Sequence, residues 1–558
     1  MEFFDAQQFV FGDEVRVADS LSDHLSVAAA LGRMKQQDLP SYLRPARAAF
    51  ISSYTVQGLA EACIAKALRH NIRLETYVAP YNQFSQEVFG AQSGLMKFKP
   101  HVTYALFDEP DIVDGVHLKN ILKGLKERIS GHVVVFLFVS SRPVGRDRST
   151  AYNGILKQSA DERLHLFDFP SFLDGIGREE HWYTKYKALG DLRLAPQAFV
   201  PLAGALMPFA VASSGATKKC LVVDLDGTLW KGIVGEDGLS GIKPDGKIQS
   251  HLKQLYERGV ILAINSKNNP DDALEVFRRH RDMVLKEDHF AAMKINWNDK
   301  ASNIREIAEE LNIGLDSLVF VDDDEFQRGL VRKFHPEVAV LSPAEVFAYP
   351  GFTSFVLTDE DRQRGAMYAQ ERKRTELSSS FPTVEDFLRD LDLKLFIQSA
   401  EDAAMARISQ LTQKTNQFNL ATRRYSEEEI RERVDSGWRV WTAQASDRLG
   451  DYGTIGAVMV EPMGSEWRID NFLFSCRVLG RGLEKAFLAF VLEKAKQDGR
   501  VSVMGEFTPT AKNKVAARFY PDNGFSGDEQ AADGVYVYRH DLDGYKAAYP
   551  GFLKLHLS

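Results

Sequence analysis

The fold of this chain is decided by the stretch Leu221-Val222-Val223-Asp224-Leu225-Asp226-Gly227-Thr228-Leu229-Trp230. Three consecutive apolar residues predict a buried strand, and the abrupt Asp-x-Asp-Gly-Thr predicts that the strand ends at a site. Two carboxylates this close together repel each other unless a cation or a chemical task compensates them. The pair Asp224 and Asp226 therefore predicts a Mg2+ site in which one carboxylate is free to attack phosphorus.

Two later strands, at residues 261–264 and 318–321, also end in polar residues. The first is followed by Asn265-Ser266-Lys267 and the second by Asp322-Asp323-Asp324. The carboxyl ends of parallel strands meet at one edge of a sheet, so we expect these groups to converge on the aspartate pair. Lys294 and Lys300 lie between the two strands, and we favour Lys300 as the cation of the site.

This order of motifs over residues 218–345 resembles the haloacid-dehalogenase (HAD) superfamily of phosphotransferases. The resemblance implies that Asp224 is the nucleophile and Asp226 the general acid/base. It implies that Ser266 binds the phosphoryl oxygens, and that the metal ligands are Asp224, Asp226, Asp322 and Asp323. The intervals between these motifs are too short for an inserted lid domain, so we expect a capless, open site.

The segment after the third strand departs from the family pattern Asp-Asp-Asn-Pro-x-Glu-Arg. Here it is Asp322-Asp323-Asp324-Glu325-Phe326-Gln327-Arg328. The two metal acids remain, and we expect Asp324 to cap a helix or to support the metal ligands from behind, and not to bind the metal itself. Simpler interpretations stay open for two residues: Ser266 as a turn residue and Lys300 as a solvated lysine at a helix start.

The composition is that of a multidomain globular protein: 558 residues, 44% hydrophobic and 26% charged. The net charge of −8 argues against a general nucleic-acid binder. We expect no membrane span, no signal segment and a cytoplasmic location. Cys63, Cys220 and Cys476 are too few and too scattered for a disulfide framework or a zinc site.

Three α/β domains are predicted, at residues 1–213, 214–375 and 376–558. In the first, strands at 72–78, 101–107 and 133–139 alternate with helices, which predicts a doubly wound parallel sheet. The second carries the HAD-like parallel sheet. The third combines β-rich segments with a helix at 483–496, which predicts a mixed α/β fold.

The loop Arg477-Val478-Leu479-Gly480-Arg481-Gly482 opens this last helix, so its backbone amides could hold a diphosphate. With Asn513, Phe519-Tyr520 and Gly524-Phe525 downstream, it resembles the GNAT N-acyltransferases. The resemblance implies an acyl-CoA or phosphopantetheine bound by the residues Arg477, Gly480, Gly482, Asn513 and Tyr520.

Cys476 stands immediately before this loop. A neighbouring arginine and a helix N-terminus both favour a thiolate, so Cys476 is a candidate catalytic nucleophile. The alternative is a small buried hydrophobe. Two nearby segments, at residues 414–419 and 447–453, are either ligand-binding or purely structural loops.

A HAD unit joined to a GNAT unit resembles the FkbH family. The motifs that carry this resemblance lie at residues 224–230, 235–238, 414–419, 451–453 and 475–480. The resemblance implies that the protein dephosphorylates 1,3-bisphosphoglycerate, or a related phosphorylated acid, and loads the glyceryl group as a thioester on the phosphopantetheine of an acyl carrier protein. Such units feed polyketide biosynthesis.

The N-terminal domain resembles more weakly the SGNH-hydrolase-like domain of longer FkbH relatives. Ser52 or Ser53 stands where its nucleophile would be, but Asp161, His165 and His181 are poorly spaced for the Asp-x-x-His element. We therefore expect a docking domain without catalytic activity.

Two other functions remain open. One is a Mg2+-dependent phosphatase with a separate GNAT activity that transfers an acyl group from acyl-CoA to a sugar or an amine. The other is a scaffold that binds a carrier protein without turnover. The intact acids argue against the scaffold, and Cys476 favours thioester transfer.

Overall fold

The computed structural model describes residues 20–140, 148–355, 357, 359–378, 380–415, 417–475, 478–510, 513–530 and 534–557. The chain divides into two compact units: residues 1–287, 293–309 and 313–362 form the first, and the remainder forms the second. The predicted fold class is confirmed, because two sheets with parallel strand pairs are followed by a mixed sheet.

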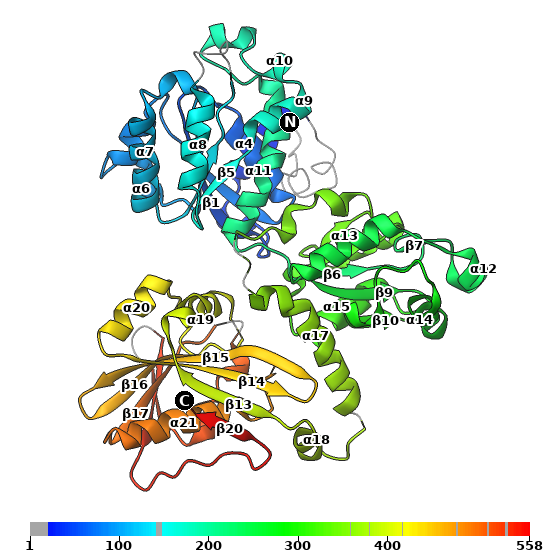
Figure 1. The fold of residues 1–558 in the computed structure, drawn as a ribbon, viewed down its shortest axis with the longest axis vertical. Coiled ribbons are helices and arrows are strands. Elements are labelled where there is room, and N and C mark those ends of the chain that lie inside the picture. The colour runs from blue at the N-terminus through cyan, green and yellow to red at the C-terminus, as the bar shows by residue number, and fades with distance from the viewer. Residues whose placement is uncertain are drawn as a thin grey trace. The chain divides into compact units, whose positions relative to one another are not determined.

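The first sheet of unit 1 is parallel, with the strand order β2-β1-β3-β4-β5. Figure 1 labels β1 and β5 of this sheet. Its strands are β1 (Arg44–Ser52), β2 (Ile72–Val78), β3 (Val102–Leu106), β4 (His132–Phe136) and β5 (Leu164–Phe167). The helices of this region are α3 (Leu21–Arg33), α4 (Leu59–Leu68), α5 (Phe84–Phe89), α6 (Gly94–Phe98), α7 (Gly115–Arg128), α8 (Ser149–Ser159), α9 (Phe169–Ile176), α10 (Arg178–His181) and α11 (Phe199–Ser214). One face packs on α4 and α11 and the other on α5, α7 and α8, which makes the sheet doubly wound.

Helix α11 is long and apolar enough, with the preceding turn, to cross a membrane by length and composition alone, contrary to our expectation. Half of that stretch is buried within the protein. Its apolar residues, among them Leu202, Leu206 and Ala210, pack in the core beside the sheet. The composition of α11 is therefore accounted for by its place as a core helix.

The second sheet has the strand order β10-β9-β6-β11-β12. Its strands are β6 (Cys220–Val223), β9 (Ile261–Ser266), β10 (Phe290–Ile295), β11 (Leu318–Val321) and β12 (Ala339–Leu341), with a small β7 (Trp230–Lys231) and β8 (Lys243–Pro244) pair beside them. Its helices are α12 (Val234–Gly241), α13 (Gly246–Glu257), α14 (Pro270–Arg279), α15 (Lys300–Glu310) and α16 (Glu325–Phe334). Strand β6 lies between β9 and β11, parallel to both, so the three strands carry their following residues to one edge.

Unit 2 contains an eight-stranded sheet with the order β18-β19-β17-β16-β15-β14-β13-β20. The strands are β13 (Lys394–Ser399), β14 (Arg439–Asp447), β15 (Gly450–Met463), β16 (Glu466–Phe474), β17 (Ser502–Phe507), β18 (Ser526–Gln530), β19 (Tyr536–Asp541) and β20 (Lys554–Leu557). The pairs β16–β17 and β13–β20 are parallel within an otherwise antiparallel sheet. The helices are α17 (Asp359–Ser378), α18 (Val384–Asp390), α19 (Asp402–Lys414), α20 (Glu427–Asp435) and α21 (Leu483–Gln497).

The second unit takes up most of α17, whereas the predicted boundary after residue 375 assigns that helix to the HAD-like domain. The physical reason is a buried ion pair. Arg374 on α17 donates two hydrogen bonds to the carboxylate of Asp447 on β14, and both side chains are almost fully buried.

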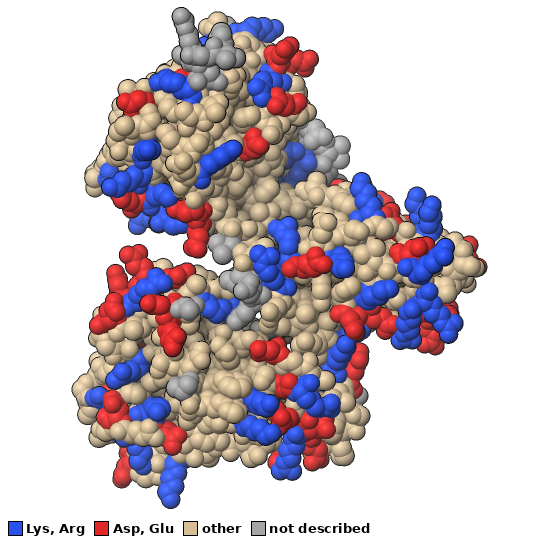
Figure 2. Space-filling model, in the orientation of Figure 1, with Lys and Arg blue, Asp and Glu red and all other residues tan. Residues whose placement is uncertain are grey.

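On the face drawn in Figure 2, basic and acidic side chains are interspersed.

Candidate active site

Three carboxylates meet at the edge of the second sheet, where β6 and β11 end. Asp224 follows β6, and Asp322 and Asp323 follow β11, whose Val321 is in register with Val223. One oxygen from each of the three lies within 4.8 Å of the others. Asp224 and Asp322 are 6% and 0% exposed, so their charges are held where water cannot screen them.

Lys300, the first residue of α15, reaches into this cluster. Its Nζ lies 3.0 Å from Asp224 Oδ2 and 2.6 Å from Asp322 Oδ2. Asn265 donates to the Lys300 carbonyl at 2.9 Å and accepts from Asn303 at 3.0 Å, which fixes the start of the helix. Lys294 instead pairs with Glu306 at 3.1 Å. Of the two lysines, the structure brings Lys300 to the acids.

The charges of the cluster are not balanced. Burial raises the pKa of Asp224 to about 6, although the Lys300 ammonium lowers it. Burial lowers the pKa of Lys300, but Asp224 and Asp322 together raise it above its ordinary value. Burial and the neighbouring Asp322 also raise the pKa of Asp323. One ammonium against three carboxylates leaves a site that favours a further cation.

The donor set fits Mg2+. Asp224 Oδ1 is buried and has no hydrogen-bond partner, so a strong acceptor in the cluster is left unsatisfied. Three carboxylates provide the hard oxygen ligands that Mg2+ prefers. Asp224, Asp322 and Asp323 are therefore the residues that could hold the ion.

Asp226 is placed differently from our expectation that it shares the ion with Asp224. Its Oδ1 accepts from Trp230 Nε1 at 2.6 Å and from the Val234 amide at 3.2 Å, and its Oδ2 accepts from Asn268 Nδ2 at 2.8 Å. Its carboxylate is not part of the three-acid cluster. In an extended strand residues i and i+2 would lie on the same face, but β6 ends at Val223 and the chain turns at Gly227, where φ is +72°, so this spacing does not place both carboxylates on one ion. The metal-ligand prediction for the Asp226 side chain is corrected accordingly.

Ser266 is the last residue of β9 and is buried. The Ser266 side chain counteracts the rise in the pKa of the Asp224 carboxyl. Gly227 allows Asp323 to approach, because a Cβ atom at this position would lie 2.2 Å from Asp323 Oδ2. Its φ of +72° also suits glycine. Asp324 caps α16 as predicted, since Oδ1 accepts from the Phe326 amide.

The sequence analysis assigned no role to Trp230, Asn268 or Asn265. In the structure, Trp230 and Asn268 hold Asp226, and Asn265 holds the backbone at Lys300. Trp230 and Asn268 stood next to motifs that we recognised, and the run of amides after β9 was a usable signal. Nothing in the sequence, however, indicates that a tryptophan four residues after an aspartate turns its N–H back to that carboxylate.

In unit 2, two predicted residues, Cys476 and Arg477, lie outside the described residues. Gly480 and Gly482 adopt φ values of +78° and +75°, which suit glycine. Tyr520 is buried against Gly505, and its hydroxyl has no hydrogen-bond partner. Asn513 is not free for a cofactor, because its amide donates to Asn419 O and Thr508 O and accepts from Thr510 N.

The end of the segment at residues 414–419 has a structural role. Strands β16 and β17 pair over residues 466–469 and 502–505. Beyond this pairing, residues 418–420 lie between the two strands: Leu420 N donates to Phe472 O, Phe474 N donates to Phe418 O, and Thr508 N donates to Leu420 O. Lys414 and Asn416 have side chains outside the described set.

In the N-terminal sheet, Ser52 and Ser53 are buried and held by neighbours. Ser52 Oγ donates to Leu106 O, and Ser53 Oγ accepts from the Asp108 amide. Asp161, His165 and His181 bond to separate partners, Lys126, His132 and Gly177 O respectively. Among the described residues of this region, 20–140 and 148–214, Ser52 and Ser53 are not brought together with these histidines and this acid.

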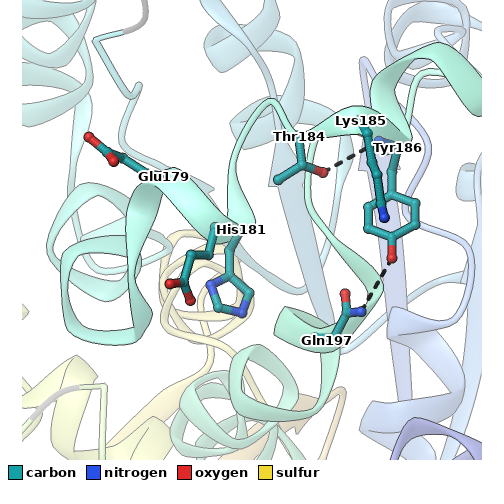
Figure 3. Close-up of a pocket in the computed structure, with 7 residues that line it drawn as sticks. Glu179, His181, Thr184, Lys185, Tyr186 and Gln197 are labelled. Atoms are coloured by element: carbon teal, nitrogen blue, oxygen red, sulfur yellow. Dashed lines mark hydrogen bonds between the residues drawn. The ribbon is translucent and has the colours of Figure 1, made fainter.

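A pocket of about 590 Å³ lies on the N-terminal part of unit 1, and Figure 3 draws its lining residues. Its lining residues include His181, Thr184, Tyr186 and Gln197, and Gln197 donates to the Tyr186 hydroxyl. None of the predicted site residues lines it.

No protein-family model and no curated protein matches this chain. Among solved structures, the N-terminal part of the protein BF1531 from Bacteroides fragilis, which contains a phosphatase domain and was crystallised with Mg, is similar at 24% identity and a TM-score of 0.50. The match covers 61% of this chain and all of that one, and it shows a shared fold.

Two acetyltransferases match a smaller part of the chain. The ribosomal-protein-S18-alanine N-acetyltransferase of Escherichia coli is 15% identical over 26% of this chain and 94% of its own, with a TM-score of 0.22. The PaiA N-acetyltransferase of Thermoplasma acidophilum, solved with coenzyme A, is 12% identical over 26% and 98%, also with a TM-score of 0.22.

Proposed function

We propose that the second sheet carries a Mg2+-dependent phosphatase or phosphotransferase site of the HAD type. The observation that carries this proposal is the Lys300 ammonium between Asp224 and Asp322, in a buried cluster whose carboxylates outnumber its positive groups. Asp224, Asp322 and Asp323 would hold Mg2+, which supplies positive charge to the phosphoryl oxygens.

In this proposal Asp224 attacks the phosphorus of a phosphate ester and forms an aspartyl phosphate. The leaving alkoxide takes its proton from Asp226, which Trp230 and Asn268 hold in one orientation. Water then attacks the same phosphorus, Asp226 accepts the proton, and Asp224 is regenerated with release of phosphate. Lys300 and Ser266 stabilise the charge on the phosphoryl group.

For the whole chain we propose an FkbH-like reaction on 1,3-bisphosphoglycerate or a related phosphorylated acid. The Cys476 thiolate would attack the acyl-phosphate carbonyl and release that phosphate, forming a thioester that keeps the second phosphate until it is hydrolysed. The thiolate of the phosphopantetheine arm of an acyl carrier protein would then take the glyceryl group and restore the Cys476 thiolate. The Asp224 site would remove the phosphate ester.

The N-terminal sheet is proposed as a docking domain. Its buried Ser52 and Ser53 hydroxyls are engaged by the backbone, which supports a role without catalysis. A location in the cytoplasm and the lack of nucleic-acid and membrane partners remain part of the same proposal.

Two alternative functions remain to be tested against this proposal. A phosphatase with a separate acyl-CoA-dependent GNAT activity would need a free diphosphate-binding loop. A carrier-binding scaffold would need no nucleophile, yet the acid cluster retains Asp224 with an unsatisfied buried oxygen.

The test is intact-mass spectrometry of a holo carrier protein incubated with the full chain, Mg2+ and 1,3-bisphosphoglycerate. We expect a glyceryl mass increment on the carrier and release of phosphate. Asp224→Asn should abolish hydrolysis of the phosphate ester, and Cys476→Ala should abolish loading. Phosphate release without any increment on the carrier would favour the separate phosphatase.

A further inference from the structure

The loop that opens α21, residues 480–484, is called here the glycine loop. Two glycines with positive φ followed by a fifteen-residue helix form an arrangement that ordinarily binds a diphosphate through backbone amides. In this chain, three groups of the protein itself occupy the surroundings of that loop.

The first group is the carboxylate of Glu484, in the first turn of α21. Glu484 is 7% exposed, and its Oε2 is buried without a hydrogen-bond partner. Burial raises the pKa of this carboxyl, while the backbone amides of Glu484 and Gly480 stabilise its ionised form. A buried carboxyl group of the chain therefore already lies in the first turn of the helix, where an anionic ligand would bind, and its charged form would repel a second anion.

The second group is the guanidinium of Arg481, the cation of the glycine loop. It bonds Glu371 on α17 and the hydroxyl of Tyr452 on β15, and it lies 5.2 Å from the Tyr452 ring centre. The side chain is 12% exposed. Tyr452 is held in turn by Asp447, to which its hydroxyl donates at 2.5 Å. The positive charge is therefore compensated inside unit 2.

The third group is the segment before β20. A Cβ atom on Gly482 would lie 3.4 Å from Pro550 Cγ and 3.9 Å from Phe552 Cζ. The segment is tied to α21 by two hydrogen bonds, from Tyr549 to Glu493 and from Lys496 to the Tyr545 carbonyl, each 2.7 Å long. Apolar atoms thus lie against the start of the helix.

We propose that the glycine loop excludes nucleotide diphosphates, so that the C-terminal unit accepts an acyl group on a thiol arm without a nucleotide, and that Glu484 is a residue that determines this specificity. The inference rests on the proposed acyl-transfer role. A pantetheine arm tethered to a protein carries one singly charged phosphodiester, whereas coenzyme A carries a diphosphate and a further phosphate.

The test compares the binding of coenzyme A and of pantetheine to the full-length protein by isothermal titration calorimetry. We expect coenzyme A to bind the unaltered protein no more tightly than pantetheine, including the case in which neither binds at millimolar concentration. We expect Glu484→Gln, which removes the charge and keeps the shape, to tighten coenzyme A binding about fivefold or more without changing pantetheine binding.

The matched control is Glu427→Gln, which alters a glutamate in the first turn of α20. It should leave both affinities unchanged. Coenzyme A that binds the unaltered protein at least tenfold more tightly than pantetheine would overturn the proposal without any use of a variant. Since binding is measured without turnover, a failure of glyceryl transfer would be seen separately in the carrier-loading assay.

Discussion

Lys300 and Asp322 form a fully buried ion pair at the edge of the second sheet, with 2.6 Å between Nζ and Oδ2. The same ammonium reaches Asp224 at 3.0 Å. This relationship couples the end of β11 to the start of α15 and gives the proposed nucleophile a positive neighbour.

Lys300→Met should lower Mg2+-dependent hydrolysis of p-nitrophenyl phosphate by about 100-fold or more, because one preorganised positive group aimed at the phosphoryl charge is lost. The control is Lys294→Met, which removes a partly exposed pair with Glu306 and should stay within about twofold of the unaltered protein. Equal losses in the two variants would contradict the assignment of Lys300 to the site.

Gly227→Ala should weaken Mg2+ binding and destabilise unit 1. The new Cβ atom would lie 2.2 Å from the Asp323 carboxylate. An alanine that adopts a φ of +72° also loses about 1–2 kcal/mol of stability. The Mg2+ concentration for half-maximal phosphatase activity should rise, and the melting temperature should fall. Gly235→Ala, with open space around its Cβ, is the control and should change neither quantity appreciably.

Trp230→Phe should lower kcat for phosphate hydrolysis about tenfold, because Asp226 loses the 2.6 Å indole donor that orients it for proton transfer. The ring itself packs against Phe277, a contact that phenylalanine can keep in large part. KM and the Mg2+ requirement should therefore change little. A rise in KM with unchanged kcat would show that Trp230 shapes substrate binding instead.

Arg374→Met should destabilise unit 2 by about 3–5 kcal/mol, since it leaves the buried Asp447 carboxylate without its ion-pair partner. Urea unfolding followed by circular dichroism would measure the change, and the double variant Arg374→Met, Asp447→Asn should recover part of it. The exposed pair of Arg389 and Glu385 provides a control, because its removal should cost about 0–1 kcal/mol.

Unit 1 should lose stability on mild acidification through His70. Burial lowers the pKa of His70 to about 4, and its Nδ1 is buried without a hydrogen-bond partner. A base whose pKa is lowered by folding binds fewer protons in the folded state, so stability is full above pH 6.5 and is lost as the pH falls toward 4.

The loss from this residue should reach about 2 kcal/mol at pH 5. Melting temperatures at pH 7.5 and 5 would test it: His70→Phe, which keeps a ring beside Tyr349, should lose less than the unaltered protein. The same loss in both proteins would show that other groups carry the acid sensitivity.

Local pattern was sufficient for most of the architecture. The apolar runs at residues 221–223, 261–264 and 318–321 all form strands of one sheet. Runs of this kind are buried wherever the chain places them, so their secondary structure depends little on distant residues. The convergence of Asp224, Ser266 and Asp322 followed from parallel connectivity alone.

Other features depended on contacts between residues far apart in the sequence. Sequence alone favoured Lys300 but left Lys294 as a second candidate, because the choice depends on which ammonium faces the end of β11 in the folded chain. Nor could it show that Asp226 turns toward Trp230 and Asn268, or that Glu371 and Tyr452 hold Arg481.

The sequence by itself determined three neighbouring strands of the second sheet and the residues that reach the edge of that sheet. Only the tertiary structure decided which of those carboxylates lie close together, which lysine faces them and which groups surround the glycine loop. The physical reason is that hydrophobic periodicity is a local property of the chain, whereas the orientation of a buried polar side chain is set by partners tens to hundreds of residues away.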